Sequence, residues 1–338
     1  MNVADNINII RHLTINRFWN LIKLGLSYQR AKLFKKFDAT ALPFAASIEP
    51  TTACNLSCPE CPSGLKQFTR STGKLGVEEN KQMLRNIGKQ LFYVNYYFQG
   101  EPFLNPNFLQ LIKDAKRQRI YTATSTNAHF ITEGNARDIV SSGLDRLIIS
   151  IDGLTQETYE QYRKNGKLDK VIAGTKALVE AKRKLNSSTP HLIFQFLAVK
   201  PNEHEIPKVF ELAKEMEIDE VRIKSAQLYD YKNGNVLIPE NPKYSRYVKG
   251  RNGQYKPKYK LANKCWRMWS STVLTWDGKV VPCCFDKDAK HVLGCATSTP
   301  FRRIWHSPAY QNFRKSVFTG RNQVEICKNC SEGAKVWV

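Results

Sequence analysis

The sequence contains no apolar run of the roughly eighteen residues that a membrane-spanning helix needs, and it does not begin with a secretory signal. Its nine cysteines fall in spacings typical of metal sites, which excludes a disulfide framework as the basis of the fold. These absences predict a cytoplasmic protein, with a peripheral position at the inner membrane surface as the alternative.

Acidic residues are also scarce, because 52 basic side chains face only 30 acidic ones. Residues 45–227 are close to balance, with 25 basic and 21 acidic residues, so the excess lies in the flanking segments. Residues 243–264 carry eight basic side chains and no acidic one, with four tyrosines between them. This pattern predicts contact with an anionic substrate or surface. Nucleic acid is not favoured, since no recognised nucleic-acid module is present.

Three cysteines near the start of the chain, Cys54, Cys58 and Cys61, are spaced so that their thiolates can converge on one cluster. No other cysteine follows before Cys265, and the nearest histidine downstream is His129. A zinc knuckle needs a fourth ligand within a short loop, and none is there. A four-iron cluster held by three thiolates keeps one iron open for a substrate or cofactor.

Strand and helix patterns alternate through the middle of the chain. The residues rich in β-branched and aromatic side chains predict strands at 45–49, 92–98, 121–127, 146–152, 191–199 and 220–225. Amphipathic stretches between them predict helices at 78–90, 108–119 and 206–216. The alternation predicts an α/β fold with parallel strands, in which catalytic groups collect at the carboxyl ends of the strands.

The last third of the chain holds a second set of cysteines, Cys265, Cys283, Cys327 and Cys330. Two pairs in a split arrangement supply four thiolates for one closed site, either an iron–sulfur cluster or a zinc ribbon. Residues 271–281 predict a β-hairpin with an Asp-Gly turn, and residues 301–318 predict a helix that returns the chain to the final pair.

The Cys-x3-Cys-x2-Cys run resembles the signature of the radical S-adenosylmethionine (radical SAM) enzymes. The resemblance implies a partial (β/α)6 TIM-like barrel with a 4Fe-4S cluster. It implies that the open iron chelates S-adenosylmethionine, which an electron cleaves to methionine and a 5′-deoxyadenosyl radical. A flavodoxin- or ferredoxin-type reductant is the implied partner.

The predicted strands end in motifs that carry the same resemblance. Residues 99–102 are similar to the family's Gly-Gly-Glu-Pro, residues 125–127 to its Ser/Thr-Thr-Asn, and residues 150–153 to its Ser-Leu-Asp-Gly. The resemblance implies these residues for S-adenosylmethionine binding: Gly100, Glu101, Asn127, Ser150, Asp152 and Arg163. Three positions depart from the pattern: Gln99, Ala128 and Glu60. Each motif alone also suits a turn or a helix cap.

The C-terminal tail resembles the auxiliary-cluster domains called SPASM, or twitch when they hold a single cluster. Its Cys-x12-Gly-x4-Cys opening matches that family, but no cysteine follows Cys330. The resemblance implies one auxiliary 4Fe-4S cluster on Cys265, Cys283, Cys327 and Cys330. Cys284 adjoins one proposed ligand and is an alternative to it. Cys295 suits a small buried apolar residue, or a proton donor to a substrate radical.

We expect four segments from this pattern: a basic amphipathic extension (1–44), the barrel (45–227), a basic tyrosine-rich linker (228–264) and the auxiliary-cluster domain (265–338), a small hairpin-and-helix unit. The extension has an apolar stripe at helical spacing flanked by basic residues. Such a helix either lies on a membrane or packs its stripe over the barrel.

We expect an oxidoreductase-type enzyme that abstracts hydrogen from a substrate C–H bond, with the auxiliary cluster accepting an electron in a net dehydrogenation or cross-link. The basic flanks favour an anionic substrate, small or linked to a lipid or nucleotide. Modification of a peptide or protein side chain is the alternative. A non-catalytic metal protein that binds nucleic acid is a third interpretation, which requires the strand-end motifs to be coincidences.

Overall fold

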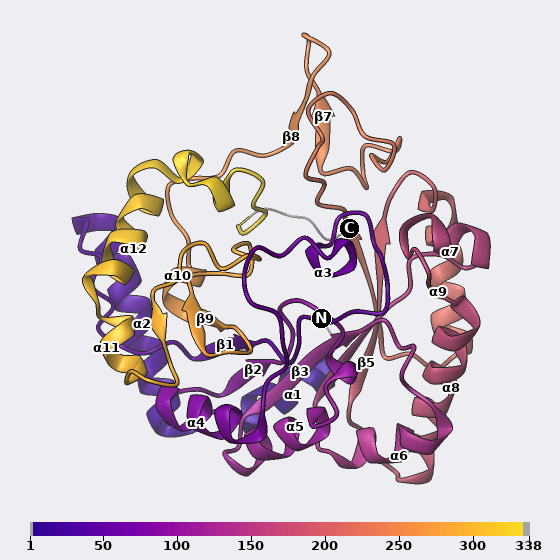
Figure 1. Cartoon of the computed structure of the whole chain (residues 1–338), viewed down its shortest axis with the longest axis horizontal. Coiled ribbons are helices and arrows are strands. Elements are labelled where there is room, and N and C mark those ends of the chain that lie inside the picture. The colour runs from indigo at the N-terminus through magenta and orange to yellow at the C-terminus, as the bar shows by residue number, and fades with distance from the viewer. Residues whose placement is uncertain (1–2, 334–338) are drawn as a thin grey trace.

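The computed structural model describes residues 3–333 and contains a curved sheet of nine strands (Figure 1). Six neighbouring strands run parallel in chain order: β1 (Ala45–Ile48), β2 (Tyr93–Asn95), β3 (Tyr121–Thr126), β4 (Arg146–Ser150), β5 (His191–Ala198) and β6 (Glu220–Ser225). A helix-containing segment joins each pair, as the crossover between parallel strands requires. The predicted partial barrel is confirmed.

The crossover helices cover the outside of the arc (Figure 1). They are α4 (Val77–Ile87), α5 (Phe108–Arg117), α6 (Glu133–Ser141), α7 (Gln156–Tyr162), α8 (Leu168–Lys184) and α9 (Ile206–Glu215). The crossovers also contain the 3-10 turns η1 (Pro102–Leu104) and η2 (Glu203–Glu205), and the single turn α3 (Pro62–Leu65), which follows Cys61 and lies inside the arc. Such helices bury an apolar side and expose a polar one, and α5 is an example: it buries Leu111 and Ala115 and exposes Arg117. The predicted helices at 78–90, 108–119 and 206–216 are confirmed to within three residues at each end.

The predicted hairpin in the C-terminal part is confirmed, and it belongs to the barrel's own sheet. β9 (Ser271–Leu274) pairs in parallel with β1, while β10 (Lys279–Val281) and β11 (Gly294–Cys295) add antiparallel strands at the edge. Gly278 in the turn has φ +84°, a conformation that glycine adopts without strain. The cysteines that flank the hairpin are thereby fixed relative to the barrel.

The prediction of one helix over 301–318 is wrong, because the structure has two. α11 (Phe301–Trp305) ends before Ser307, whose hydroxyl accepts a hydrogen bond from the backbone N–H of Tyr310. α12 (Pro308–Gly320) begins at a proline, which has no N–H to continue the earlier helix. Three short elements complete this part: α10 (Arg267–Ser270), η3 (Arg321–Gln323) and η4 (Glu325–Cys327).

The segment predicted to be a linker, 228–264, is folded. β7 (Tyr247–Lys249) and β8 (Tyr255–Pro257) form a two-stranded sheet that projects from the top of the molecule in Figure 1. Residues before β7 pack over the cysteine loop, where Leu228 and Ile238 share a small core with Leu56. The segment therefore forms a cover over one side of the first cysteine motif.

Two helices precede the barrel, α1 (Val3–Arg11) and α2 (Ile15–Phe34). The predicted helical stripe is confirmed as α2, but the interpretation that this stripe packs over the barrel is wrong. α2 buries Arg17, Asn20, Leu24, Ser27 and Ala31 and leaves most of its large apolar side chains exposed. Within residues 3–333, no helix combines the length and the apolar character needed to cross a membrane.

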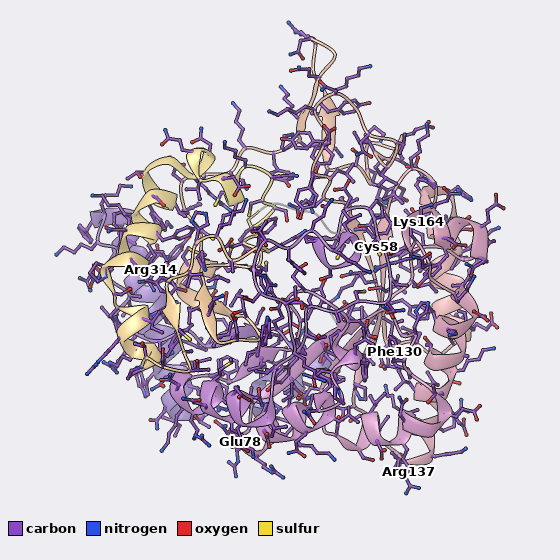
Figure 2. The ribbon with its side chains drawn as sticks, viewed as in Figure 1. Cys58, Glu78, Phe130, Arg137, Lys164 and Arg314 are labelled. Carbon is purple, nitrogen blue, oxygen red and sulfur yellow. The ribbon has the colours of Figure 1, made fainter. Side chains whose placement is uncertain are left out.

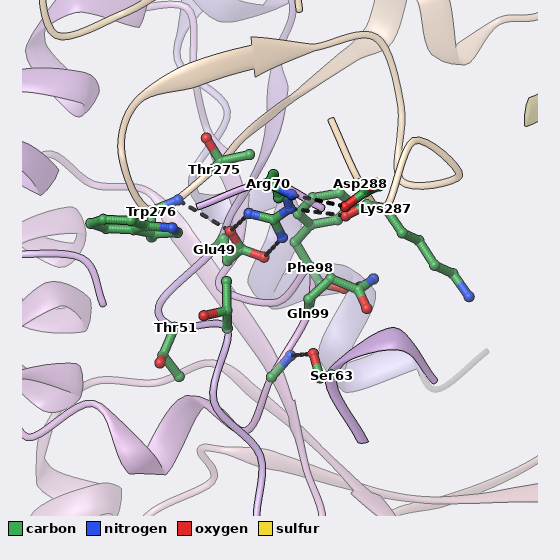
Figure 3. Close-up of polar contacts among 12 residues, drawn as sticks. Glu49, Thr51, Ser63, Arg70, Phe98, Gln99, Thr275, Trp276, Lys287 and Asp288 are labelled. Atoms are coloured by element: carbon green, nitrogen blue, oxygen red, sulfur yellow. Dashed lines mark hydrogen bonds and ion pairs between the residues drawn. The ribbon is translucent and has the colours of Figure 1, made fainter. Parts of the chain in front are cut away.

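A buried ion pair ties the barrel to the C-terminal part (Figure 3). Both carboxylate oxygens of Glu49, at the end of β1, accept hydrogen bonds from the Arg70 guanidinium, at 2.6 and 2.8 Å. Arg70 Nε also donates to the Lys287 carbonyl at 3.1 Å, and the Trp276 N–H donates to Glu49 at 3.3 Å. Both charged side chains are at most 5 % exposed, so each depends on the other for its charge.

We expect Arg70→Met to destabilise the protein by about 3–5 kcal/mol, because it leaves the Glu49 carboxylate buried without its partner. Burial already raises the pKa of Glu49, so this carboxylate accepts a proton as the pH falls. The destabilisation should therefore lessen at low pH. Anaerobic chemical denaturation of the reconstituted protein measures it.

The matched control is Arg183→Met, which removes an exposed ion pair with Glu217 and should cost less than about 1 kcal/mol. An Arg70→Met protein as resistant to denaturant as this control would show that the Glu49–Arg70 pair does not hold the two parts together.

Candidate active site

A cavity of about 520 Å³ opens at the carboxyl ends of the parallel strands, and Cys54, Cys58 and Cys61 all line it. Of the six residues predicted to bind S-adenosylmethionine, the structure places five on its wall: Gly100, Glu101, Asn127, Ser150 and Arg163. A larger groove of about 1030 Å³ lies between α6 and α8, but no cysteine lines it. The smaller cavity is therefore the candidate site.

The cysteine loop is fixed by contacts along its length. The Ser57 N–H donates to the Lys164 carbonyl at 3.1 Å, and Figure 2 shows Lys164 beside Cys58. The Cys61 N–H donates to the Cys58 carbonyl at 3.2 Å, and the Leu56 N–H donates to Cys54 Sγ at 3.5 Å. Backbone N–H groups aimed at sulfur are characteristic of iron–sulfur sites, whose potential they tune.

The end of β2 lies against this loop. The Gly100 N–H donates to Ser63 Oγ at 2.9 Å, and the Glu101 N–H donates to the Ala53 carbonyl at 2.7 Å. Gly100 has φ +74°, and a Cβ there would collide with the backbone oxygen of Thr51. Only glycine fits this position, because both the backbone conformation and the close approach exclude a side chain.

Glu101 is the most completely buried carboxylate of the cavity wall. Its oxygens accept hydrogen bonds from Thr126 Oγ1 and the Asn127 N–H, each at 2.8 Å, and from the Phe103 N–H at 3.2 Å. Burial raises the pKa of Glu101 to about 7, although the Asn127 N–H favours the ionised form. Without a ligand, the Glu101 carboxylate therefore changes charge near neutral pH. A bound hydrogen-bond donor or cation favours its ionised form.

Asn127 lies between the end of β3 and the cysteine loop. Its amide donates to Asn55 Oδ1 at 2.8 Å and lies 3.9 Å from Cys54 Sγ. Ser150 lines the cavity from the end of β4. Side chains from three successive strand ends thus meet at the cysteines, as the parallel order requires.

Asp152 is the one predicted cofactor residue that does not line the cavity. It is fully buried behind Arg163, and its Oδ2 accepts a hydrogen bond from Arg163 Nε at 2.5 Å. Its Oδ1 accepts from the Leu197 N–H at 2.7 Å. Arg163 in turn points its Nη1 to within 3.8 Å of Cys58 Sγ. Asp152, which follows β4 and is held by β5, therefore fixes the position of the Arg163 guanidinium.

The thiols of Cys54 and Cys58 are protonated in the metal-free protein. Burial raises the pKa of Cys54 to about 12, and it raises that of Cys58 against the opposing effect of Arg163. Any metal that binds these cysteines must displace the protons, since thiolate is the ligand.

The second cysteine set lies between β10, α10 and η4. Cys265, Cys283, Cys327 and Cys330 are all buried. Burial raises the pKa of Cys265 and of Cys327 to about 11, and Cys330 lies near enough to raise both further. Cys330 Sγ accepts hydrogen bonds from Arg321 Nη2 and the Glu332 N–H, both at 3.3 Å. The four predicted ligands are therefore neighbours in the fold.

In the part of the chain from 3 to 333, no three cysteine, histidine or acidic side chains are grouped as they would be around a single metal ion. One tetrahedral zinc holds four thiolates about 2.3 Å from a common centre. A four-iron cluster instead binds each thiolate at a different iron.

The two remaining cysteines have different surroundings. Cys284 lines the cavity, whereas the adjacent Cys283 is buried beside Cys327 and Cys330. Cys295 lies on β11, partly exposed, with its thiol 3.0 Å from Thr297 Oγ1. It does not line the cavity, so the structure gives no support to a proton donor there, nor to a fully buried apolar residue.

The side of the cavity away from the trio is basic, and motif analysis missed most of it. Four cations line it: Lys224, Arg246, Arg267 and Lys287. Burial lowers the pKa of Lys224, and the nearby Arg246 lowers it further. Only Arg246 falls in the basic run at 243–264 that the sequence marked. Lys224 lies on β6, Arg267 on α10 and Lys287 between β10 and β11, so they share no motif.

Glu60, one of the departures from the family pattern, has a structural role. Its carboxylate accepts a hydrogen bond from the Tyr229 N–H at 2.8 Å, so it ties the cysteine loop to the covering segment. Burial raises the pKa of Glu60.

Comparison with protein families gives two matches. The model of the radical SAM superfamily matches residues 48–220, and the SPASM model, an iron-sulfur cluster-binding domain, matches residues 265–331. The PqqA peptide cyclase of Gluconobacter oxydans is 23 % identical over 317 residues, which cover 87 % of this chain and 84 % of that protein.

Two solved structures share the fold. SuiB of Streptococcus suis, bound to S-adenosylmethionine, gives a TM-score of 0.64 at 16 % identity and covers 90 % of this chain and 75 % of its own. BtrN in complex with AdoMet and 2-DOIA gives 0.52 at 18 % identity and covers 86 % of this chain and 94 % of its own.

We expect the affinity for S-adenosylmethionine to depend on the ionisation of Glu101. An ionised carboxylate accepts hydrogen bonds from the amino group of that ligand better than a protonated one. Since the pKa of Glu101 is raised to about 7, affinity should fall as the pH is lowered through that value. The fall approaches about tenfold per pH unit below the pKa. Anaerobic calorimetry of the cluster-loaded protein between about pH 8 and pH 6 measures it.

Glu101→Gln should bind more weakly and lose this pH dependence, whereas Glu78→Gln, on the exposed start of α4, should keep both affinity and slope. An unchanged slope in Glu101→Gln would assign the pH dependence to another group.

Proposed function

Because the chain belongs to the radical SAM superfamily, we propose that it reductively cleaves S-adenosylmethionine and abstracts a hydrogen atom from a C–H bond of an anionic substrate. The chain is an enzyme that binds a 4Fe-4S cluster and S-adenosylmethionine, and its SPASM domain binds auxiliary iron–sulfur. One observation carries the proposal: the cysteine trio, three strand ends and a set of cations line a single cavity.

We assign the first cluster to Cys54, Cys58 and Cys61. Their shared cavity wall and the Leu56 N–H aimed at Cys54 Sγ support this assignment. When bound there, the cluster supplies the electron that splits S-adenosylmethionine to a 5′-deoxyadenosyl radical. The protein's part is to orient the reactants and to exclude water and oxygen from the cavity.

We assign the amino group of S-adenosylmethionine to Glu101 and its carboxylate to Arg163. Both side chains line the cavity, and each is held from behind: Glu101 by β3 and Arg163 by Asp152. Gly100, Asn127 and Ser150 complete this wall. Asp152 is then a positioning residue, which sets the direction of the guanidinium.

We assign the auxiliary cluster to Cys265, Cys283, Cys327 and Cys330. The burial of Cys283 beside Cys327 and Cys330, and the place of Cys284 on the cavity wall, favour Cys283 as the ligand. A cluster held by four thiolates has no open iron, so it supplies an electron acceptor for a substrate radical. The net reaction is then an oxidation, either a dehydrogenation or a cross-link.

The anionic substrate class rests on the basic side of the cavity. Arg246 is 3 % exposed, and its Nε has no hydrogen-bond partner within residues 3–333. Arg267 already pairs with Glu332 at 3.0 Å. Like charges that share a cavity wall repel one another, so a phosphate or carboxylate bound near Lys224, Arg246 and Lys287 relieves this repulsion.

A peptide substrate is the second candidate. The PqqA peptide cyclase matches 87 % of this chain, and a further SuiB structure holds its precursor peptide SuiA. An acidic peptide side chain near the basic wall satisfies the same charges. We propose a flavodoxin- or ferredoxin-type electron carrier as the reductant in either case.

Iron analysis tests the two cluster assignments. We expect about eight irons per chain in anaerobically reconstituted wild type, and about four after Cys54, Cys58 and Cys61 are replaced by alanine. S-adenosylmethionine should perturb the electron paramagnetic resonance signal of wild type and not that of the triple variant.

Cys295→Ala is the matched control, because its thiol lies off the cavity and should not change the iron content. Cys284→Ala should also retain about eight irons. A loss of four irons in Cys284→Ala would move the auxiliary ligand to that residue, and no loss in the triple variant would overturn the first assignment.

The formation of 5′-deoxyadenosine tests the substrate class. We expect anion-exchange fractions of a cell extract that hold acidic metabolites to accelerate its formation. Arg246→Met should abolish this acceleration and leave the slow substrate-free cleavage unchanged, whereas Lys249→Met, on exposed β7, should behave as wild type. Stimulation that disappears after the fractions are treated with protease would favour the peptide candidate instead.

A further inference from the structure

The second helix of the chain, α2, is inverted relative to an ordinary surface helix. Its buried face carries the polar residues Arg17, Asn20 and Ser27 together with Leu24 and Ala31. Most of its large apolar residues point outward: Ile15 is 78 % exposed, Trp19 56 % and Leu26 62 %. A surface helix normally buries its apolar stripe, so this exposure needs an explanation.

The inverted orientation is fixed by hydrogen bonds on the inward face. Arg17 donates to four backbone carbonyls, those of His12, Lys89, Gln118 and Arg119, at 2.6 to 3.1 Å. Asn20 donates to the Leu42 carbonyl at 2.8 Å. Ser27 accepts from Trp269 Nε1 at 3.1 Å. A rotation of the helix to bury its apolar side would break all of these bonds.

The first helix is arranged in the same way. Asp5 is buried against Arg146 and Tyr121, and Asn8 donates to Asp145 at 3.0 Å, so its polar side faces the barrel. Its isoleucines at 7 and 10 are exposed. Of the seventeen large apolar side chains exposed in residues 3–333, ten lie in residues 3–34. We call these ten the N-terminal apolar face: Val3, Ile7, Ile10, Ile15, Phe18, Trp19, Ile22, Leu26, Leu33 and Phe34.

Basic residues border the N-terminal apolar face. Arg11, Lys23, Lys32, Lys35 and Lys36 are exposed beside it. Residues 1–44 have two acidic side chains: Asp5 is buried, and Asp38 lies 3.9 Å from Arg30. A helix with apolar and aromatic residues on one side and lysines along its edges lies in the plane of an anionic lipid surface.

We propose that the N-terminal apolar face docks on an anionic membrane surface, with the apolar side chains among the lipids and the lysines at the phosphate headgroups. A second copy of the chain fits less well, because it brings the same basic border against itself. The carbonyls that hold Arg17 precede β2 and β3, at the amino ends of the strands. Docking there leaves the cavity at the carboxyl ends accessible.

Vesicle flotation of the reconstituted enzyme tests the proposal. We expect wild type to bind vesicles of phosphatidylcholine with phosphatidylglycerol, and to bind vesicles of phosphatidylcholine alone much more weakly. Added salt should weaken binding, since screening reduces the attraction of the lysines to the headgroups. A Trp19→Ser, Leu26→Ser variant should lose at least about tenfold in affinity, because two exposed apolar side chains no longer enter the lipid.

Phe210→Ser, Val292→Ser is the matched control, since it removes two exposed apolar side chains elsewhere and should bind like wild type. Circular dichroism and substrate-free cleavage of S-adenosylmethionine should be unchanged in both variants, which shows that they fold. Absence of vesicle binding by wild type, or equal binding by both variants, would overturn the proposal. A wild-type dimer that Trp19→Ser, Leu26→Ser converts to a monomer would assign the face to a second copy instead.

Discussion

One buried carboxylate joins the parts of the active site. Glu101 follows β2, its side chain accepts hydrogen bonds from Thr126 and Asn127 at the end of β3, and its own N–H binds Ala53 in the cysteine loop. Two strand ends and the loop are therefore positioned by the same residue. Because it is buried and titrates near neutrality, the group is ready to respond to a ligand that donates hydrogen bonds.

Positive charge accompanies both cysteine sets. Arg163 approaches Cys58 Sγ to 3.8 Å, and Arg321 donates to Cys330 Sγ at 3.3 Å. The metal-free thiols of Cys58 and Cys330 are neutral because burial raises their pKa values, whereas a cluster held by thiolates is anionic. On the proposed cluster assignment, the arginines compensate a charge that exists only after the cluster is in place. Arg163 is fixed beforehand by Asp152, and Arg321 by the carbonyls of Ala262 and Lys264, so little rearrangement is needed.

The barrel and the cavity wall could be predicted because their signals are local in the chain. Strand periodicity marked the order, and each motif stands at the end of its strand or within a few residues of it. The outward direction of α2 could not be predicted, because periodicity shows that apolar residues share a face and not which way that face points.

The break before Pro308 was overlooked although proline marked it. The basic wall was missed since Lys224 and Lys287 meet only through the fold. The ligand assignments themselves remain predictions.

The cavity is built in two halves from different stretches of sequence. The cysteine loop and the ends of β2, β3 and β4 supply one half, while the ends of β5 and β6 and the segments after residue 228 supply the other. Polar contacts join the two halves, among them Glu60 to Tyr229 and Arg70 to Lys287. Because each half is lined by its own residues, a substitution on the substrate side replaces no residue of the cofactor side. A chain of this design can evolve toward new substrates while it keeps the same radical chemistry.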